Sequence, residues 1–370
     1  MDPQFVSNLQ GLLQKLASAS DTDTIQAVTA ALGQQFYTVA GCVPALLAIA
    51  KDDQQWQVRQ LAAVELRKRI TKFWDEIDDG TQQQMRDALL AAVVDESSAP
   101  VRHALARAIA AAAYLDIPKQ KWGELFQFLY KLCQSPAAAQ REIGAYMVDA
   151  LCETIAVVME AHMKPLLELI AALANDGESL AVRVSAIEAL GKMADFVESG
   201  DRPMVAAFQS LVPTMVQTLQ RCLETGDEDS ASSCFEVLNG MVLSDVPFLN
   251  RHLGEMVGFS INVGASEELS DSLRIMALNF LVWTASYKRG RLQKLKVVGQ
   301  LIDKMMPITA LDDPADDDDD SPSRIITEGG VDYMRPQVGD FVTLICAGLS
   351  DPDTLVRRAS CMALGCIAGK

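Results

Sequence analysis

The sequence predicts an all-α protein built from repeated pairs of antiparallel helices. A turn, usually holding an acidic residue, is followed by an arginine and then by small and apolar residues at helical spacing, and this pattern occurs six times. Its arginines are Arg59, Arg102, Arg141, Arg183, Arg274 and Arg357. The first four follow one another at 43, 39 and 42 residues. A period of about 40–47 residues with two helices per unit is typical of HEAT and armadillo solenoids. We therefore expect a HEAT-repeat solenoid, a right-handed superhelix of about eight to nine helix pairs.

The turn before each arginine indicates how the repeats stack. In four of the six copies an Asp or Glu lies six residues before the arginine, as Asp53 lies before Arg59. Such a carboxylate can accept hydrogen bonds from the amides of the helix behind it. It can also meet an arginine of the neighbouring repeat, which would build a ladder of ion pairs along the stack. These residues are therefore predicted to be structural.

The first two pairs follow from apolar spacing and capping residues. Residues 4–18 carry leucines on one face, and Asp21 or Asp23 is a candidate N-cap for a helix that extends to Phe36. The second pair is expected over 42–51 and 54–74, and its second helix ends in a basic turn that suits the negative end of the helix dipole.

The same spacing predicts the later pairs. They are 81–95 with 98–114, 119–133 with 137–158, 162–174 with 179–198, 203–224 with 228–243, and 246–262 with 268–287. Residues 292–308 open an eighth pair, and 337–349 with 353–368 form the last one. The final helix carries no polar cap, although a solenoid needs one at each end. We therefore expect one array over 1–370 that is the N-terminal fragment of a longer protein.

An acidic loop over 311–324 interrupts the eighth repeat. Its aspartates are Asp312, Asp313, Asp316, Asp317, Asp318, Asp319 and Asp320. Like charges at this density repel, so an extended or disordered loop is expected. The loop either binds a partner or serves as a solubilising linker. It lacks the spacing and the glycine of an EF-hand, which argues against a calcium or magnesium site.

Composition narrows the function classes. The net charge of −17 argues against nucleic acid as a direct partner and suits a basic protein ligand. The eight cysteines form no CxxC or Cys/His cluster, so free thiols in a reducing compartment are expected. The start of the chain is not that of a signal peptide, and no uncharged apolar run reaches about 18 residues, so no membrane association is expected.

Nothing in the sequence predicts catalysis. His103, His162 and His252 are isolated and lack metal-ligand spacing. No Ser/His/Asp or Cys/His set can be assembled, so we expect a protein that is not an enzyme and has no cofactor.

Charged stripes on the second helices are the candidate binding residues. The acidic ones are Glu142, Asp149, Glu153, Glu188, Asp195 and Glu236, and the basic ones are Arg67, Lys68 and Lys72. The acidic stripe could receive lysines and arginines of a partner by charge steering, or it could be a solvated helix face. The basic residues could meet a partner, or they could complement the helix dipole.

Several segments resemble the importin-β (karyopherin-β) family of nuclear transport receptors. The run Arg59-Gln-Leu-Ala-Ala-Val-Glu-Leu-Arg-Lys-Arg-Ile resembles the second repeat of that family. The opening Met1-Asp-Pro-Gln-Phe and the run Arg141-Glu-Ile-Gly144 are similar to its importin-four (karyopherin-123) branch. The aspartate run also falls where the family carries an acidic loop.

The resemblance implies a receptor that carries cargo through the nuclear pore and shuttles between cytoplasm and nucleus. The family binds the Ran GTPase in its GTP form through its N-terminal repeats, here 1–160, and Ran binding releases import cargo. It binds phenylalanine-glycine (FG) nucleoporins through the outer helices and cargo through the inner ones. The importin-four branch is associated with basic cargo such as histones H3/H4 and ribosomal proteins, and a monomer is expected.

The alternative is a HEAT scaffold subunit of a multiprotein complex, such as a phosphatase. Scaffolds of that kind usually have more uniform repeats and no reason to keep a long aspartate loop. The acidic loop therefore favours the transport receptor.

Overall fold

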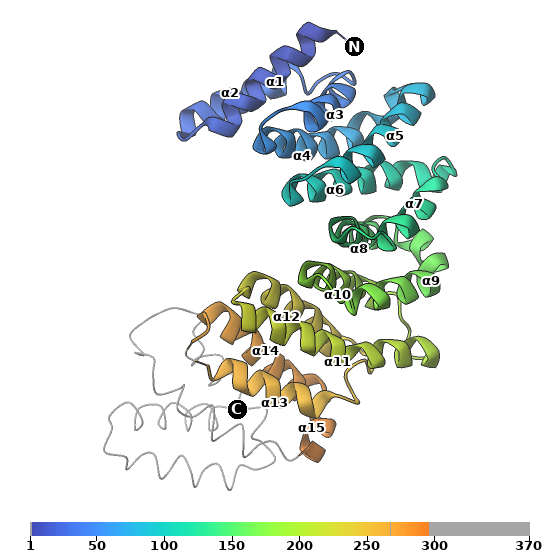
Figure 1. The fold of residues 1–370 in the computed structure, drawn as a ribbon, viewed down its shortest axis with the longest axis vertical. Coiled ribbons are helices and arrows are strands. Elements are labelled where there is room, and N and C mark those ends of the chain that lie inside the picture. Colours follow the sequence, from blue (N-terminus) through green and yellow to red (C-terminus); the bar gives the residue numbers. More distant parts are fainter. Residues whose placement is uncertain (1, 267, 296–370) are drawn as a thin grey trace. The chain divides into compact units, whose positions relative to one another are not determined.

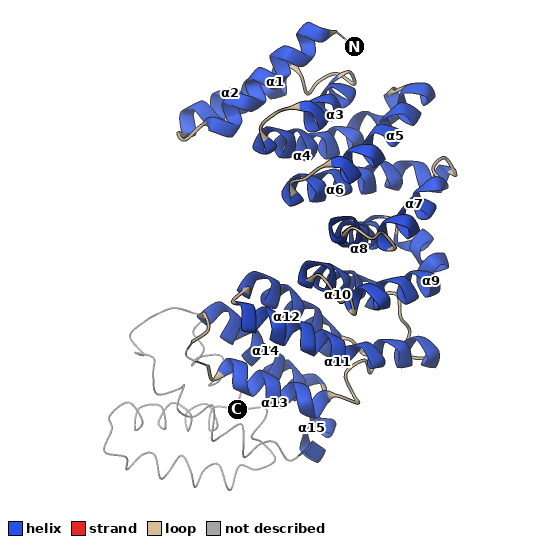
Figure 2. Cartoon of the chain, in the orientation of Figure 1, coloured by secondary structure: helices blue, strands red, loops and turns tan. Residues whose placement is uncertain are grey.

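The computed structural model describes residues 2–266 and 268–295, and within them every regular element is a helix (Figure 2). The chain divides into two compact units, Met1–Met193 and Ala194–Lys370. Each unit is described separately below. The acidic loop, the rest of the eighth pair and the predicted last pair lie outside the described residues.

The first unit holds the first five predicted helix pairs (Figure 1). They are α1 (Pro3–Ser18) with α2 (Thr22–Gln35), α3 (Cys42–Asp52) with α4 (Trp56–Phe73), α5 (Asp79–Asp95) with α6 (Ala99–Asp116), α7 (Glu124–Cys133) with α8 (Ala138–Thr154), and α9 (Ala156–Ala174) with α10 (Leu180–Ala194). The predicted pairs are confirmed, and most helix ends lie within a few residues of the expected ones. The N-cap of α2 is Asp21, whose carboxylate accepts the amide of Thr24 at 2.7 Å, while Asp23 lies in the first turn.

One boundary in this unit was predicted wrongly. A break was expected between residues 158 and 162, but α8 ends at Thr154 and α9 begins at Ala156. Only Ile155 separates them, with φ −123° and ψ 43°. The apolar run on both sides of Ile155 suits either helix, so its spacing alone does not show where the chain turns.

The helices of the first unit form two layers. The second helices stack on one another, α4 on α6 and α6 on α8, and in the first four pairs the first helix lies against its own second helix. The middle helix, α6, is rich in alanine, and Ala104, Ala108 and Ala112 are all buried. Small side chains let three helix backbones approach closely, while leucines and isoleucines fill the space between the layers.

Arginines connect successive repeats, as the sequence predicts. Arg59 donates from Nη1 to the carbonyl of Asp53 in its own turn at 2.9 Å. Its Nε and Nη2 donate to the Glu96 carboxylate of the next turn at 2.7 and 2.9 Å. Glu96 also accepts the amide of Ser98 at 2.8 Å. One guanidinium therefore holds two turns together, and the carboxylate it meets accepts the backbone amide of Ser98, the residue just before α6.

The pattern recurs two joints further along, at Arg141. Arg141 donates to the carbonyl of Ser135 at 3.0 Å and to the Asp176 carboxylate at 2.6 Å. Burial alone would raise the pKa of Asp176, but Arg141 and the amides of Glu178 and Ser179 lower it on balance. This carboxylate therefore stays ionised in the folded protein, and its contribution to stability is lost only as the pH falls through its lowered pKa.

The ladder departs from this pattern where the turn lacks an acid. Because position 135 is a serine, Arg102 meets no turn carboxylate and instead lies 3.7 Å from Glu142 on α8. At the first joint, Asp53 is met by the amides of Gln10 and Gln14 on α1 at 2.6 and 3.0 Å. Neutral amides thus replace the arginine at that end of the array.

The second unit contains α11 (Arg202–Thr225), α12 (Glu228–Leu243), α13 (Leu253–Gly264), α14 (Asp271–Tyr287) and α15 (Arg289–Leu295). In it α12 packs on α11 and α14, and α13 packs on α14. The helix expected from residue 246 begins only at Leu253. The intervening segment buries Phe248 against Phe208, with ring centroids 5.1 Å apart, and the Pro247 carbonyl accepts Gln209 Nε2 at 2.7 Å.

No helix among the described residues is both long and apolar enough to cross a membrane.

Gly144 tests how tightly α7 and α8 cross. A Cβ atom there would lie 2.8 Å from Cys133 Sγ and 3.1 Å from the Cys133 backbone nitrogen. We expect Gly144→Ala to lower the free energy of unfolding by about 1–3 kcal/mol, because the backbone must shift. Gly33→Ala in α2 is the matched control, because that position has open space and alanine favours the helix by about 1 kcal/mol. Urea unfolding of both variants measures the difference, and two equal stabilities would show that the crossing is loose.

Candidate functional site

The exposed side of the second helices in the first unit carries the candidate site. Arg67, Lys68 and Lys72 are exposed on the C-terminal half of α4 and are called the basic patch below. Lys68 Nζ lies 2.6 Å from Glu65, yet half of its side chain is exposed. Lys72 Nζ lies 4.5 Å from the centroid of the Phe73 ring. The basic patch therefore presents three cations to solvent on a chain with a large negative net charge.

Arg69 lies in the same run but is held inside the protein. Its guanidinium lies 4.1 Å from the centroid of the Tyr37 ring and 2.9 Å from Glu65. This stacking fixes the end of α4 against the segment that follows α2, so Arg69 supports the basic patch without belonging to it.

Two helix pairs beyond α4, carboxylates gather on the second helix α8 and on the next second helix, α10. Asp149, Glu153 and Glu188 form what is called the acidic patch below. Burial raises the pKa of Asp149 to about 6, and the Glu188 carboxylate adds to the shift, while Lys192 opposes it. Part of this shift comes from repulsion by the carboxylates of Glu188 and Glu153. A cation from a partner would relieve that repulsion.

Helix α6 lies between the two patches and adds an aromatic contact. The His103 ring stacks on the Tyr146 ring of α8 at 3.9 Å with an interplanar angle of 5°. Arg107 lies 5.6 Å from the centroid of the same ring. Sequence analysis missed this group. The signal was the four-residue spacing of His103 and Arg107, which places them on one helix face.

Glu142 belongs to the internal network of this region. It is 7% exposed, and its carboxylate lies 2.5 Å from His103 Nε2 and 3.4 Å from Ser185 Oγ. With Arg102 at 3.7 Å, Glu142 joins α6, α8 and α10. Glu142 is therefore a buried residue that supports the acidic patch, and it is not part of the solvent-facing surface.

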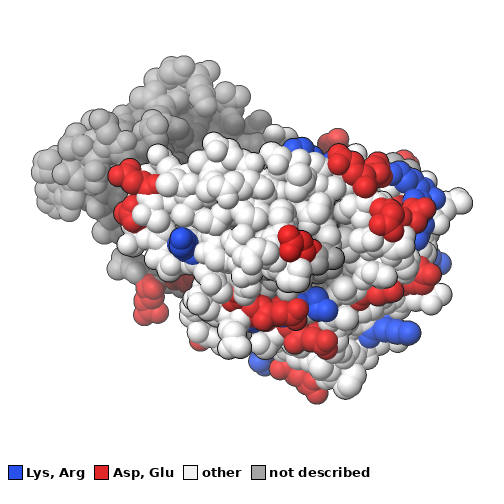
Figure 3. Space-filling model, turned by 90° about the horizontal axis from the view of Figure 1, so that it is seen from above, with Lys and Arg blue, Asp and Glu red and all other residues white. Residues whose placement is uncertain are grey.

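The remaining predicted residues lie outside this face. Asp195 and Glu236 belong to the second unit and are exposed, and Asp195 follows the last residue of α10. The seven aspartates from Asp312 to Asp320 fall outside the described residues. Figure 3 shows charged side chains over one face of the molecule, where acidic ones outnumber basic ones.

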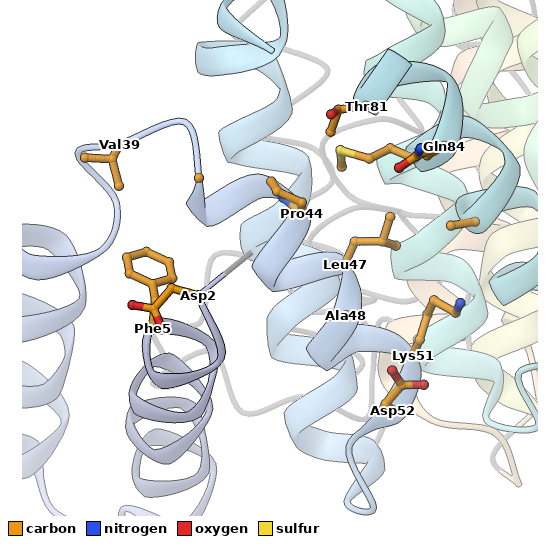
Figure 4. A pocket seen from close by; sticks show the side chains of 13 residues that line it. Asp2, Phe5, Val39, Pro44, Leu47, Ala48, Lys51, Asp52, Thr81 and Gln84 are labelled. Atoms are coloured by element: carbon orange, nitrogen blue, oxygen red, sulfur yellow. The ribbon is translucent and has the colours of Figure 1, made fainter. Parts of the chain in front are cut away.

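A groove on the first-helix layer is the second candidate feature. It has a volume of about 690 Å³ and is lined by residues of α1, α3, α5 and the segment before α3. Figure 4 shows Phe5 and Val39 on one side of it and Leu47 on another, with Lys51 and Asp52 at one end. Val39 is 46% exposed, although it is apolar. The groove therefore offers an accessible apolar surface bordered by charges. Sequence analysis could not place it, because three separate helix pairs contribute to it.

Among the described residues no group of three or more His, Cys, Asp or Glu side chains could hold a metal ion.

Family models match most of the chain in consecutive segments. Residues 30–95 match the importin-β N-terminal domain, residues 97–259 match the TPR repeats of importin-5-like proteins, and residues 341–370 match a HEAT repeat. The chain is 30% identical over 373 residues to the probable importin subunit beta-4 of Schizosaccharomyces pombe, which covers 99% of this chain and 34% of that protein. It is 23% identical over 423 residues to importin-4 of Mus musculus, which covers 97% of this chain and 38% of that protein.

Solved structures agree on the fold. A crystal structure of Kap121p bound to RanGTP matches with a TM-score of 0.79 at 19% identity, over 100% of this chain and 36% of that one. A structure of Kap121p bound to Nup53p matches with a TM-score of 0.76 at 20% identity, over 100% and 37%. The chain thus spans about a third of the length of its relatives.

The carboxyl group of Asp149 predicts a pH-dependent stability. Its pKa is near 6 in the folded protein and near 3.8 when unfolded. Folding therefore stabilises the protonated form, and that stability is present below about pH 4 and is lost as the pH rises through 6. We expect Asp149→Asn to be more stable than the parent by about 1–3 kcal/mol at pH 8 and equal to it near pH 4.

Urea unfolding at several pH values measures this difference. Glu160→Gln is the control, because Glu160 is an exposed carboxylate on α9 outside the acidic patch. If the difference in the free energy of unfolding between the parent and Asp149→Asn is the same at pH 4 and pH 8, the pKa of Asp149 is not raised.

Proposed function

The chain belongs to the importin-β family, and on that premise we propose that it acts as part of a nuclear import receptor that binds Ran in its GTP form, basic cargo and FG nucleoporins. Such a protein works by binding and release, without catalysis. It would act as a monomer that moves between cytoplasm and nucleus through the nuclear pore complex. The observation that carries this proposal is the separation of a basic patch and an acidic patch along one layer of second helices.

The basic patch supports a Ran site within residues 1–160. Arg67, Lys68 and Lys72 lie in the segment that matches the importin-β N-terminal domain. The nearby Glu65 pairs with Lys68 and Arg69, so it orders the patch without covering it. A structural relative, Kap121p, has been solved bound to RanGTP. Cations on a protein of net charge −17 favour an acidic partner surface and exclude nonspecific basic ligands from that spot.

The acidic patch supports binding of basic cargo such as histones H3/H4 and ribosomal proteins. Asp149, Glu153 and Glu188 lie close enough to raise the pKa of Asp149, so a lysine or arginine placed among them gains from three carboxylates at once. Glu236 on α12 and Asp195 are exposed acidic residues of the second unit. We propose that they and the aspartates from Asp312 to Asp320 also attract basic partners. Competition between Ran and cargo for a shared layer of second helices would account for release.

The groove of the first-helix layer supports nucleoporin binding. Its apolar lining, from Phe5 and Val39 to Leu47, suits a phenylalanine side chain, and its location on the first helices separates it from both charged patches. An FG repeat could therefore bind while Ran or cargo occupies the second helices. Such simultaneous binding is what passage through the pore requires of a loaded receptor.

A Ran-binding measurement tests the first part of the proposal. The immobilised 370-residue chain is offered Ran loaded with GTP or GDP, and selective binding of the GTP form is expected. The double variant Lys68→Glu, Lys72→Glu should weaken that binding about tenfold or more, because each reversal replaces an attraction by a repulsion.

Lys119→Glu, Lys121→Glu is the matched control, because it changes the net charge equally at lysines that pair with Asp75 and Asp79 outside the basic patch. Equal binding of both nucleotide forms, or none, by the folded chain would sink the proposal and favour a scaffold protein.

Binding of a histone H3 tail peptide tests the cargo assignment. We expect affinity to fall as salt rises, because the contact is largely between exposed charges. The reversal Glu153→Lys, Glu188→Lys should weaken it about tenfold, whereas Glu160→Lys, Glu168→Lys on α9 should have little effect. If the affinity for the peptide changes neither with salt concentration nor in either variant, the acidic patch is not the binding site.

An FG-repeat peptide tests the groove. Ala48→Glu places a charge in the apolar lining and should abolish measurable binding, while Ala91→Glu, exposed on α5 outside the groove, should not. Fluorescence anisotropy of a labelled peptide measures both, with a serine-glycine peptide as the negative control. If Ala48→Glu binds as well as the parent, the nucleoporin site lies elsewhere.

A further inference from the structure

The arginine ladder of the first unit has one joint without a turn carboxylate. Arg59, Arg102 and Arg141 all donate from Nη1 to carbonyls of their own turn, five and six residues earlier. The three guanidinium groups are therefore held in the same way. In Arg59 and Arg141 the Nε and Nη2 atoms then donate to the acid of the next turn. Arg102 is 9% exposed, yet its Nε has no hydrogen-bond partner within the part of the chain that the structure describes.

Ser135 occupies the place of the missing acid. It lies six residues before the arginine of its own repeat, as Glu96 does. It also makes the same local contact, because the Ser135 hydroxyl accepts the amide of Ala137 at 3.1 Å, just as Glu96 accepts the amide of Ser98. The same hydroxyl donates to Gln140 Oε1 at 2.5 Å. This turn is therefore built like its neighbours and lacks only the negative group.

A phosphate on Ser135 has the reach of the missing carboxylate. The terminal oxygens of phosphoserine are as many bonds from Cβ as the carboxylate oxygens of glutamate. Glu96 uses that reach to accept two hydrogen bonds from Arg59, at 2.7 and 2.9 Å. A phosphate carries a charge of about −1.5 to −2, and it pairs strongly with the two parallel donors of an arginine. Phosphorylation would therefore supply Arg102 with the kind of partner that Arg59 and Arg141 already have.

Glu142 fills this gap only in part. Its carboxylate lies 3.7 Å from Arg102 Nη2, which is beyond hydrogen-bond distance, and its Oε1 lies beside His103 Nε2. Its Oε2 has no hydrogen-bond partner among the described residues. Arg102 therefore keeps donor capacity for a second anion. Repulsion between that anion and Glu142 is the main cost of the arrangement.

The turn also carries the local sequence that one class of kinases recognises. Ser135 is followed by Pro136, and serine precedes proline only once more in the chain, at Ser321. Proline-directed protein kinases require that proline. Gln134, Pro136 and Ala137 are exposed, and Ser135 is half-buried in a segment that is not helical. Because both partners of its hydroxyl lie in this turn and the start of α8, local opening of the turn is enough to expose it.

We propose that Ser135 is a phosphorylation site for a proline-directed protein kinase, and that its phosphate completes the ladder by pairing with Arg102. The Ser135 hydroxyl oxygen attacks the γ-phosphorus of ATP, and an O–P bond forms. The bond from that phosphorus to the bridging oxygen of the β-phosphate breaks, ADP leaves, and the hydroxyl proton passes to a carboxylate base of the kinase. The modification strengthens the joint between α6 and α8. This inference does not depend on the proposed transport function.

Treatment of the folded 370-residue chain with ATP and a mitogen-activated protein kinase tests the assignment of the site. Phosphopeptides are mapped by mass spectrometry in a Ser321→Ala background, which removes the other serine–proline site. We expect a phosphate on Ser135, and none at this turn in Ser135→Ala. A peptide of residues 128–142 is the control substrate. The proposal is overturned if the peptide is phosphorylated and the folded chain is not, and equally if neither is.

Thermal unfolding tests the pairing with Arg102. With phosphoserine incorporated in place of Ser135, the thermal midpoint should rise by about 2–4 °C, and the rise should disappear in Arg102→Gln. Arg102→Lys keeps the charge but not the two parallel donors, so it should keep at most half of the rise, and it decides the test if Arg102→Gln does not fold.

Two results would contradict the pairing. A rise of the same size with and without Arg102 would mean that the phosphate only complements the dipole at the start of α8. A midpoint that falls on phosphorylation would mean that repulsion from Glu142 outweighs the attraction of Arg102. Either result overturns the proposal.

Discussion

The structure of the first unit depends on one side chain used repeatedly, an arginine near the start of a second helix. Arg59 and Arg141 each donate to a carbonyl of their own turn and to a carboxylate of the next turn. Both partners are largely shielded from solvent, with the Arg141 and Asp176 side chains 10% and 7% exposed. In such a site an arginine without its carboxylate would leave a buried charge unpaired. The two joints made by Arg59 and Arg141 are therefore fixed by a requirement for complete pairing more than by the area they bury.

This constraint explains why the candidate site can be built from charged residues. With the joints held by arginines inside the stack, the outward side of α4, α8 and α10 is free to vary in charge. Glu142 shows how the two roles meet. It takes the place that a turn carboxylate has elsewhere and faces Arg102 and His103. It thereby supports the helix on which Glu153 is exposed and Asp149 is half-buried. The groove of the first-helix layer is formed by the other side of the same stack, so the two kinds of site do not compete for space.

The sequence predicts most of this fold, because the regular spacing of similar residues indicates a repeat. The helix pairs, the Asp21 cap and the pairing of Arg59 and Arg141 with the next turn all follow from local rules. The errors occur where local rules allow two answers. The apolar run around Ile155 suits either helix. The segment before Leu253 is apolar and buried, as a helix would be, but it is not helical. The stacking of His103 on Tyr146 and the shape of the groove depend on residues from different helix pairs. Residue spacing within one helix does not reveal how far apart such residues lie. The internal role of Glu142 could not be predicted for the same reason. Its spacing from Asp149 predicts the face of α8 on which it lies, but not the neighbouring side chains that bury it.

A double-mutant cycle on Arg141 and Asp176 measures how strongly this ion pair holds the joint between α8 and the next turn. The free energy of unfolding is measured for the parent, Arg141→Met, Asp176→Asn and the double variant. If the pair holds α8 to the next turn, each single change should cost about 3 kcal/mol, and the double variant should cost clearly less than their sum, with a coupling of at least about 1.5 kcal/mol. Additive effects with a coupling near zero would show that the joint is held by apolar packing alone, and the account of the ladder would be wrong.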